Sequence, residues 1–316
     1  MRRRFRKDET INTDLPLQEE CHVSNVIPYR EGISTPKSSK TRLSATGGQI
    51  IAGLILILFL IITAFPLVWT LISSLKSSQE ILTSALSLPE KPQWINYVNA
   101  VRVTGITKSY LNSVIVTALS VVVNAYIALL AAYVFARFRF PARQTLMLMF
   151  ALGILIPVNS ALLPIKLIMD YFKLSNSLTG LAILYSAIGL PTSILILSSH
   201  ITGIPPEIDE SARIDGAGWL TVVNKIIVPI AHPGLVTVAI LQAIYCWNEF
   251  LFAMVLVSSE AKRTLQVAIR FFVGRFFFDY GGLFAAMVLA ILPLVIVFII
   301  FQNSIVSALS SGAIKF

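Results

Sequence analysis

The amino-acid sequence predicts an all-α protein that crosses a membrane six times. Apolar residues make up 56% of its 316 residues and charged residues only 13%, and the mean hydropathy is +0.78. Soluble domains usually contain about 25% charged residues. Charge-free apolar windows of about 20 residues, the length that spans a bilayer as a helix, recur along the chain. These observations together indicate a polytopic membrane protein in contact with the lipid bilayer.

Six apolar windows define six expected spans. The first is longer than the apolar core of a signal peptide, so we expect it to remain as a membrane anchor. Six spans put both termini on one side of the membrane. The expected spans cover residues 50–72, 111–136, 146–165, 177–199, 234–258 and 283–308, and residues 302–316 hold the end of the last helix and a short C-terminus.

The N-terminal segment, residues 1–48, is expected to be a disordered basic tail. It combines the basic cluster at residues 2–7 with Ser, Thr, Pro and acidic residues, and it lacks helical periodicity. A basic cluster beside a span is typical of a cytoplasmic tail attracted to anionic lipids. We therefore interpret the net charge of +9 as a sign of membrane association, and expect no nucleic-acid partner.

The orientation follows from a short basic turn, because the overall Lys/Arg count is almost balanced between the two sides. Arg137, Arg139 and Arg143 crowd the connection between the second and third expected spans. Positive charges in short loops favour the cytoplasm. This rule places the turn, both termini and the loop at residues 203–233 in the cytoplasm of a cell-membrane protein.

The loop at residues 203–233 interrupts the apolar pattern with charge. Pro205 and Pro206 suit the first turn of a helix, where a missing N–H costs nothing, and acidic side chains that follow are favoured by the helix dipole. Asp209 and Arg213 have the i,i+4 spacing of an ion pair. We expect a helix from residue 206, a sharp glycine turn, and a second helical run over residues 219–228 that ends at Pro229.

Seven residues of this loop resemble the EAA loop of binding-protein-dependent ABC importer permeases. They are Glu210, Ala212, Asp215, Gly216, Ala217, Pro229 and Pro233, with Glu207 in the acidic first turn. Ser211 and Val223 depart from the commonest form, where a second alanine and an aromatic residue are usual. In that family the loop docks on a separate ATPase, so the resemblance implies that this segment couples the chain to ATP hydrolysis.

Other segments are similar to the carbohydrate permeases of the maltose and multiple-sugar type. They include residues 131–141, Ile156-Pro157, residues 247–251, residues 263–265 and residues 312–315. The resemblance implies a type I ABC importer permease fold with its core at residues 107–301. It also implies a second homologous permease subunit, two copies of a cytoplasmic ATPase, and an extracellular solute-binding protein.

Catalytic and cofactor functions are not indicated by the residues. The chain has no Gly-Lys dipeptide, and hence no phosphate-binding loop of the Walker type. Its two cysteines and three histidines are scattered, so we expect no metal site and no cofactor. The chain is thus expected to be a non-catalytic subunit.

Polar residues within the expected spans are candidates for the translocation path. Glu249 is the single charged residue in those windows, and Asn159, Tyr245, Trp247 and Asn248 are the other candidates. Polar groups in a membrane should face protein or a wet cavity, because facing lipid is costly. Lining the sugar path and bracing helix packing remain alternative roles for them. Asn124 in the second span is expected to face protein or water for the same reason.

Three other classes of function compete with the sugar importer. A permease for a non-sugar solute would share every motif named above. An ion-coupled secondary transporter is expected to show inverted repeats and charged relays, and neither stands out here. An intramembrane enzyme needs paired catalytic groups at a common depth, and the sequence offers none.

Overall fold

The computed structural model describes residues 47–103, 105–270 and 279–313, and that part of the chain contains helices and loops but no strands. The predicted tail at residues 1–48 lies outside the described residues, except for the two glycines that begin the first helix. By length and composition, four described helices can cross a membrane, and six spans result if each of two bent helix pairs counts as one. The all-α, six-span prediction is consistent with this count.

Four of the predicted spans are uninterrupted helices. Pro66, Pro191 and Pro293 lie inside three of them without ending the helix. The helices extend a few residues beyond the predicted windows, since polar residues at their ends continue the backbone hydrogen bonding. They are α1 (Gly47–Ser73), α4 (Ile106–Arg137), α7 (Leu178–Thr202) and α15 (Tyr280–Ala313).

The third predicted span, residues 146–165, is not one helix. Helix α5 (Arg143–Leu155) ends before Pro157, and the chain resumes as the 3₁₀ turn η1 (Val158–Ala161) and α6 (Leu162–Tyr171), at 92° to α5. A residue that precedes proline is disfavoured in the helical region. Ile156 accordingly has an extended conformation, with ψ 121°.

The fifth predicted span, residues 234–258, is also broken. Helix α11 (His232–Asn248) stops at Glu249, which is extended, and α12 (Leu251–Leu256) begins two residues later. No proline lies at this break. The side chain of Glu249 caps the second helix, as described below, and this stabilises the interruption.

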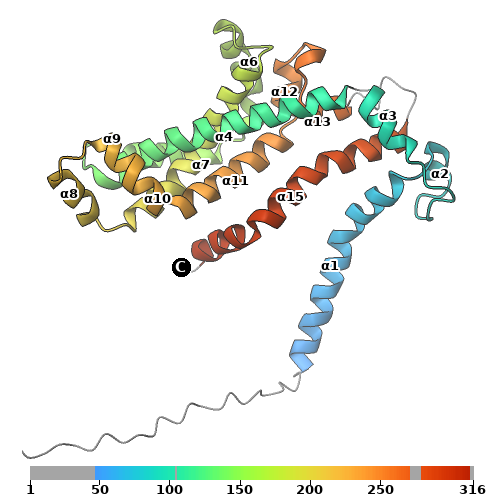
Figure 1. Cartoon of the computed structure of the whole chain (residues 1–316), viewed down its shortest axis with the longest axis horizontal. Coiled ribbons are helices and arrows are strands. Elements are labelled where there is room, and N and C mark those ends of the chain that lie inside the picture. The colour runs from blue at the N-terminus through green and yellow to red at the C-terminus, as the bar shows by residue number, and fades with distance from the viewer. Residues whose placement is uncertain (1–46, 104, 271–278, 314–316) are drawn as a thin grey trace, which may run out of the picture. The chain divides into compact units, whose positions relative to one another are not determined.

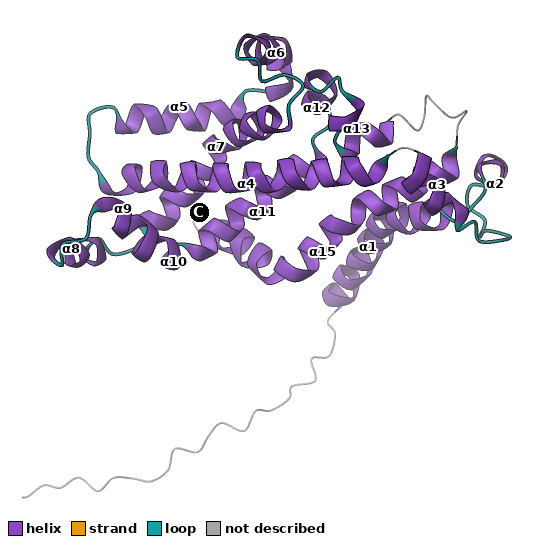
Figure 2. Ribbon diagram, turned by 45° about the horizontal axis from the view of Figure 1, so that its top comes forward, coloured by secondary structure: helices purple, strands orange, loops and turns teal. Residues whose placement is uncertain are grey.

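Helices α4, α7 and α11 pack together, with the closest association between α4 and α7 (Figure 1). Helix α5 packs on α7 and runs beside α4 in the second view (Figure 2). The residues of the 203–233 loop gather at one end of these helices.

The remaining short elements are α2 (Ser78–Thr83), α3 (Ile95–Val103), α8 (Glu207–Ile214), α9 (Trp219–Val222), the π-helix η2 (Val223–Ile227), α10 (Val228–Ile230), η3 (Glu260–Lys262) and α13 (Leu265–Arg270).

A buried polar seam joins the three central helices. Asn124 of α4, which is fully buried, donates to the carbonyl oxygen of Ser186 at 2.8 Å and accepts from the Ser193 hydroxyl at 2.7 Å, both on α7. Gln242 of α11 donates to Ser120 Oγ of α4 at 2.9 Å. Hydrogen bonds between helices stabilise packing in a membrane, where apolar burial provides little driving force. The expectation that Asn124 faces protein or water is confirmed.

Gly189 of α7 allows Gln242 to approach the helix backbone. A Cβ at this position would lie 2.9 Å from Asn124 Nδ2 and closer still to Gln242 Oε1. We therefore expect Gly189→Ala to destabilise the purified chain by about 1–3 kcal/mol, the usual cost of overpacking. Thermal unfolding in detergent measures this effect.

Gly153→Ala on α5 is the matched control, because its Cβ would meet only Pro191 Cγ, at 3.9 Å. Helix propensity alone favours alanine over glycine by about 1 kcal/mol. Equal melting temperatures for the two variants would show that the seam does not require close packing at Gly189.

Candidate functional site

Helix α8 begins where the prolines predict. Pro206 is its N-cap residue, and Glu207, Asp209 and Glu210 occupy its first turn. Negative charge is favoured there, because the unpaired N–H groups and the helix dipole make that end positive. The predicted helix start is confirmed.

A left-handed glycine ends α8. Gly216 has φ +84°, its N–H donates to the Arg213 carbonyl at 3.0 Å, and the N–H of Ala217 donates to the Ala212 carbonyl at 2.9 Å. These two bonds form a Schellman motif, which satisfies the last carbonyls of a helix and favours glycine at the left-handed position. The turn to α9 thus depends on Gly216.

The predicted ion pair between Asp209 and Arg213 does not form. Asp209 instead accepts from Arg137 Nε of α4 at 2.7 Å, and the two side chains are only 5% and 9% exposed. Asp209 points toward the helix bundle, and a buried carboxylate requires a charged partner more strongly than an exposed carboxylate does. A long-range pair therefore replaces the local one.

Arg213 also reaches α4, by a different route. Its Nη2 donates to the Tyr133 hydroxyl at 3.3 Å, and its Cζ lies 5.8 Å from the centre of the Phe138 ring. A guanidinium over an aromatic face is attracted by the negative charge of the ring. Both arginines therefore tie α8 to the end of α4.

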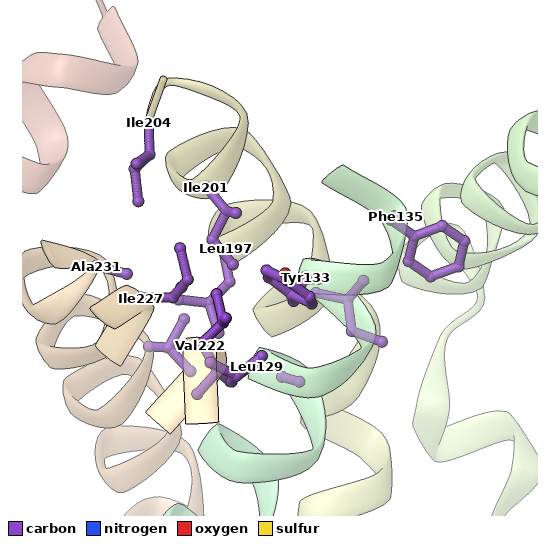
Figure 3. Packing of buried hydrophobic residues seen from close by; sticks show 14 of the residues in the cluster. Leu129, Tyr133, Phe135, Leu197, Ile201, Ile204, Val222, Ile227 and Ala231 are labelled. Atoms are coloured by element: carbon purple, nitrogen blue, oxygen red, sulfur yellow. The ribbon is translucent and has the colours of Figure 1, made fainter. Parts of the chain in front are cut away.

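Apolar side chains fill the space under α8. Tyr133 is fully buried, and Ala212 is buried in the same cluster, which continues through Ile201, Val222 and Ile227. Figure 3 shows side chains of α4, α7 and the second helical run converging there. Ala212, a predicted loop residue, thus faces the bundle and supports the helix from below.

The opposite face of the loop is exposed and mixes acidic with large apolar side chains. Ile214 is 86% exposed, and Trp219 and Leu220 are about half exposed. Glu207, Glu210, Asp215 and Gly216 are also exposed, and Ala217 is partly buried. We call residues 206–220 the coupling knob. Exposed large apolar groups beside charge are typical of a surface that binds another protein.

The second helical run extends past its predicted end. It continues through η2 and α10 to Ile230, with Pro229 in the first turn of α10. A π-helix widens the turn that precedes the proline, which relieves the clash between the ring and the carbonyl four residues earlier. The chain then bends by 82° into α11, where Pro233 occupies the first turn. Both prolines are exposed and flank this bend.

Both carboxylate oxygens of Glu249, the charged residue of the fifth predicted span, accept hydrogen bonds from other residues of the chain. Its Oε1 accepts from the backbone N–H of Phe252 at 2.7 Å and its Oε2 from that of Ala253 at 3.1 Å. The hydroxyl of the buried Tyr185 on α7 also donates to this carboxylate. A carboxylate at a helix N-terminus satisfies unpaired N–H groups. Glu249 therefore caps α12 and joins it to α7.

The other candidates for the path have different surroundings. Trp247 is buried, donates from Nε1 to the Ala290 carbonyl of α15 at 3.0 Å, and contacts the ring of Tyr110 edge to face. Asn248 and Asn159 are exposed, the first donating to the Ile244 carbonyl at 2.9 Å. Trp247 therefore packs α11 against α15 and α4.

Tyr245 borders a cavity of ≈ 240 Å³ between α5, η1, α7 and α11. The cavity is lined mainly by apolar side chains, with Thr192, Ser193 and Gln242 adding polar atoms. Mixed linings of this kind are typical of sites for small molecules. Tyr185 contacts both Tyr245 and Glu249. The centre of its ring lies 5.9 Å from that of Tyr245, and its hydroxyl donates to the Glu249 carboxylate.

Among the described residues, no cluster of His, Cys, Asp and Glu could hold a metal ion.

Broken apolar helices thus surround a polar seam, and the coupling knob lies exposed at one end of them. Residues 124–311 match the family described as binding-protein-dependent transport system inner membrane component. The chain belongs to this family, whose members are non-catalytic transport components of the inner membrane.

The chain is similar to several proteins of known name. It is 35% identical over 83% of its length to the diacetylchitobiose uptake system permease protein NgcG of Streptomyces coelicolor, covering 87% of that protein. It is 32% identical over 79% of its length to the trehalose transport system permease protein SugB of Mycobacterium tuberculosis, covering 92% of it. A chain in the crystal structure of a bacterial ABC transporter involved in alginate import has the same fold, with a TM-score of 0.74, 24% identity, and coverage of 85% of this chain and 99% of that one.

Proposed function

We propose that this chain is a membrane-spanning permease subunit of an ATP-driven sugar importer. It forms half of the translocation pathway and docks a separate ATPase through the coupling knob. The observation that carries the proposal is the knob itself, a short helix with an acidic and apolar outer face supported by a buried cluster. The names of the similar permeases, which include diacetylchitobiose and trehalose transport, favour a sugar as the solute.

Three partners follow from this function. Two copies of a cytoplasmic ATPase would bind the knobs, an extracellular solute-binding protein would deliver the sugar, and a second homologous permease would complete the path. The apolar side chains of α1 agree with a second permease or lipid as neighbour, because its membrane window is 0% buried within this chain. We further propose that exposed Glu210 meets a basic pocket on the ATPase, where a charge-assisted hydrogen bond fixes the register.

The path would run past the exposed side chains of Asn159 and Asn248 and past Tyr245, which borders the cavity. Amides and aromatic faces are suited to the hydroxyl groups and apolar faces of sugars. Glu249 would act there by holding α12 and Tyr185 in place. ATP-driven closure of the ATPase dimer would move the knob and rock the helices between inward-open and outward-open states.

Uptake by cells that carry the complete set of neighbouring genes tests the proposal. Radiolabelled diacetylchitobiose and trehalose serve as probes, and we expect uptake of at least one to require the ATPase gene and the binding-protein gene. Uptake that survives deletion of the ATPase gene but stops with a protonophore would instead support an ion-coupled transporter. Accumulation of a non-sugar solute under the same gene requirements would support the non-sugar permease.

The orientation is a separate prediction. Reporter fusions after Arg139 and near Gly218 should report the cytoplasm, and fusions near Pro92 and Arg270 the outside. The basic turn before α5 favours this arrangement. A reversed pattern would remove the coupling knob from the compartment that contains ATP, and the docking mechanism would fail.

A further inference from the structure

The coupling knob is attached to its own bundle by the apolar cluster under α8 and by two arginine contacts, as well as by the covalent chain. At one end of α8, Asp209 pairs with Arg137 of α4 at 2.7 Å. Near the other end, Arg213 contacts Tyr133 of α4 and Phe138, the residue that directly follows α4. The two contacts come from successive turns of α8 and converge on the last two turns of α4.

The two covalent connections of α8 differ in stiffness. The chain enters α8 through buried Ile204 and through Pro205 and Pro206, whose φ angles are fixed, and leaves it through Gly216 and Gly218. Gly216 and Gly218 have open space around their Cβ positions, so little packing restrains them. Glycine-containing segments absorb changes in backbone angle readily. A pull on the exposed face of α8 would therefore be taken up at the glycine exit unless side chains hold the helix.

We propose that Arg137 and Arg213 form an arginine clasp that makes the coupling knob and α4 one rigid body. Movement of the knob is then passed to α4, whose other turns carry the polar seam with α7 and α11. Arg137 and Asp209 are positioning residues that act through α4 and do not contact the solute. This inference rests on the proposed docking function, since it concerns what happens to the force after the ATPase has bound.

Burial makes the Arg137–Asp209 ion pair the stronger of the two contacts in the clasp. Both side chains are below 10% exposure, so neither charge is well solvated when its partner is removed. Breaking a buried pair by removing one charge is much more disruptive than breaking an exposed one. The clasp should consequently be lost in single substitutions and recovered when the charges are exchanged.

Spin-label distances in the assembled complex test the proposal. Labels at Ser211 on α8 and Val122 on α4, both exposed, are introduced with Cys21 and Cys246 replaced by Ser. In the parent complex we expect a narrow distance distribution that stays the same when Mg²⁺ and a non-hydrolysable ATP analogue are added. Asp209→Asn and Arg137→Met should each broaden the distance distribution. The variant with exchanged charges, Asp209→Arg with Arg137→Asp, should restore a narrow distribution. Lys225→Met, which removes an exposed cation from the same region, should leave it narrow.

A second measurement separates positioning from stability. Leu241 is exposed and lines the cavity that Tyr245 borders. The rate at which a maleimide labels Leu241→Cys should change on adding the ATP analogue to the parent complex. Asp209→Asn should lose this change while the ATPase still co-purifies. A narrow distribution or a normal nucleotide response in Asp209→Asn overturns the clasp, as does a parent distance that shifts with nucleotide. A parent complex without ATPase or without any nucleotide response contradicts the proposed function instead, and the distance measurement without nucleotide still tests the clasp.

Discussion

Replacing Gly216 with Glu is expected to abolish transport while the chain still inserts into the membrane. Gly216 adopts φ +84° at the end of α8, and a side chain in this left-handed conformation costs about 1–2 kcal/mol. That strain is too small to prevent insertion of the spans. Open space around the Cβ position means that the new carboxylate would project from the exposed face of the knob. It would there meet the proposed ATPase surface, block close approach and add charge. Uptake measured beside the amount of chain in the membrane gives the result.

Gly216→Asn is the matched control, because asparagine tolerates the left-handed conformation better than other residues with side chains. It should retain more transport than the glutamate variant at equal membrane content. Normal transport by Gly216→Glu would mean that the knob does not approach another surface closely, and the docking assignment would be wrong.

Replacing Glu249 is expected to have the second-largest effect, and to act first on the amount of assembled complex. The carboxylate accepts two backbone N–H bonds from α12 and one hydroxyl bond from Tyr185. Each hydrogen bond to a charged group contributes about 1.5–3 kcal/mol. Glu249→Ala leaves the two N–H groups unpaired and should lower the yield strongly. Glu249→Gln keeps the shape and one carbonyl acceptor, so the loss should be smaller. Yield of complex and turnover per complex, measured on the same preparation, describe both effects.

Asn248→Ala provides the control for yield, since this neighbouring side chain is exposed and bonds only a carbonyl of its own helix among the hydrogen bonds of the described residues. Tyr185→Phe removes one hydrogen bond to Glu249 and should reproduce part of the loss of yield expected for Glu249→Ala. In the double variant the loss should be smaller than the sum of the two single losses, because both changes remove the same interaction. Full yield with altered turnover in Glu249→Gln would instead support a direct role in the sugar path.

The sequence predicts the spans well and their interruptions poorly. Apolar runs indicate where a helix can lie in lipid, and α1, α4, α7 and α15 follow them closely. The breaks depend on single residues within equally apolar segments. Pro157 could be recognised, because the residue before a proline leaves the helical region. The break at Glu249 is harder to predict. Its carboxylate caps α12 through the nearby N–H groups of Phe252 and Ala253, but its third partner, Tyr185, is far away in the sequence.

The coupling knob shows the same division between local and long-range information. The prolines, acidic first turn and Gly216 predict the start and end of α8, because capping depends on neighbouring residues. The partner of Asp209 could not be predicted, since the nearby Arg213 and the distant Arg137 have the same charge. Burial decides between them, and burial of one helix face becomes known only once α8 is placed on α4.

The measurement that tests the central claim most directly is co-purification of the ATPase with this chain through the coupling knob. Membranes from cells expressing the full set of neighbouring genes are solubilised, and an affinity tag on this chain recovers its partners. We expect a nucleotide-binding subunit in the eluate of the parent chain, and its loss from the eluate of Ile214→Asp, which places a charge on the side chain that is 86% exposed on the knob. A second permease should remain in both eluates. Recovery of the same amount of ATPase with the parent chain and with Ile214→Asp, or recovery of no ATPase with either, would contradict the account.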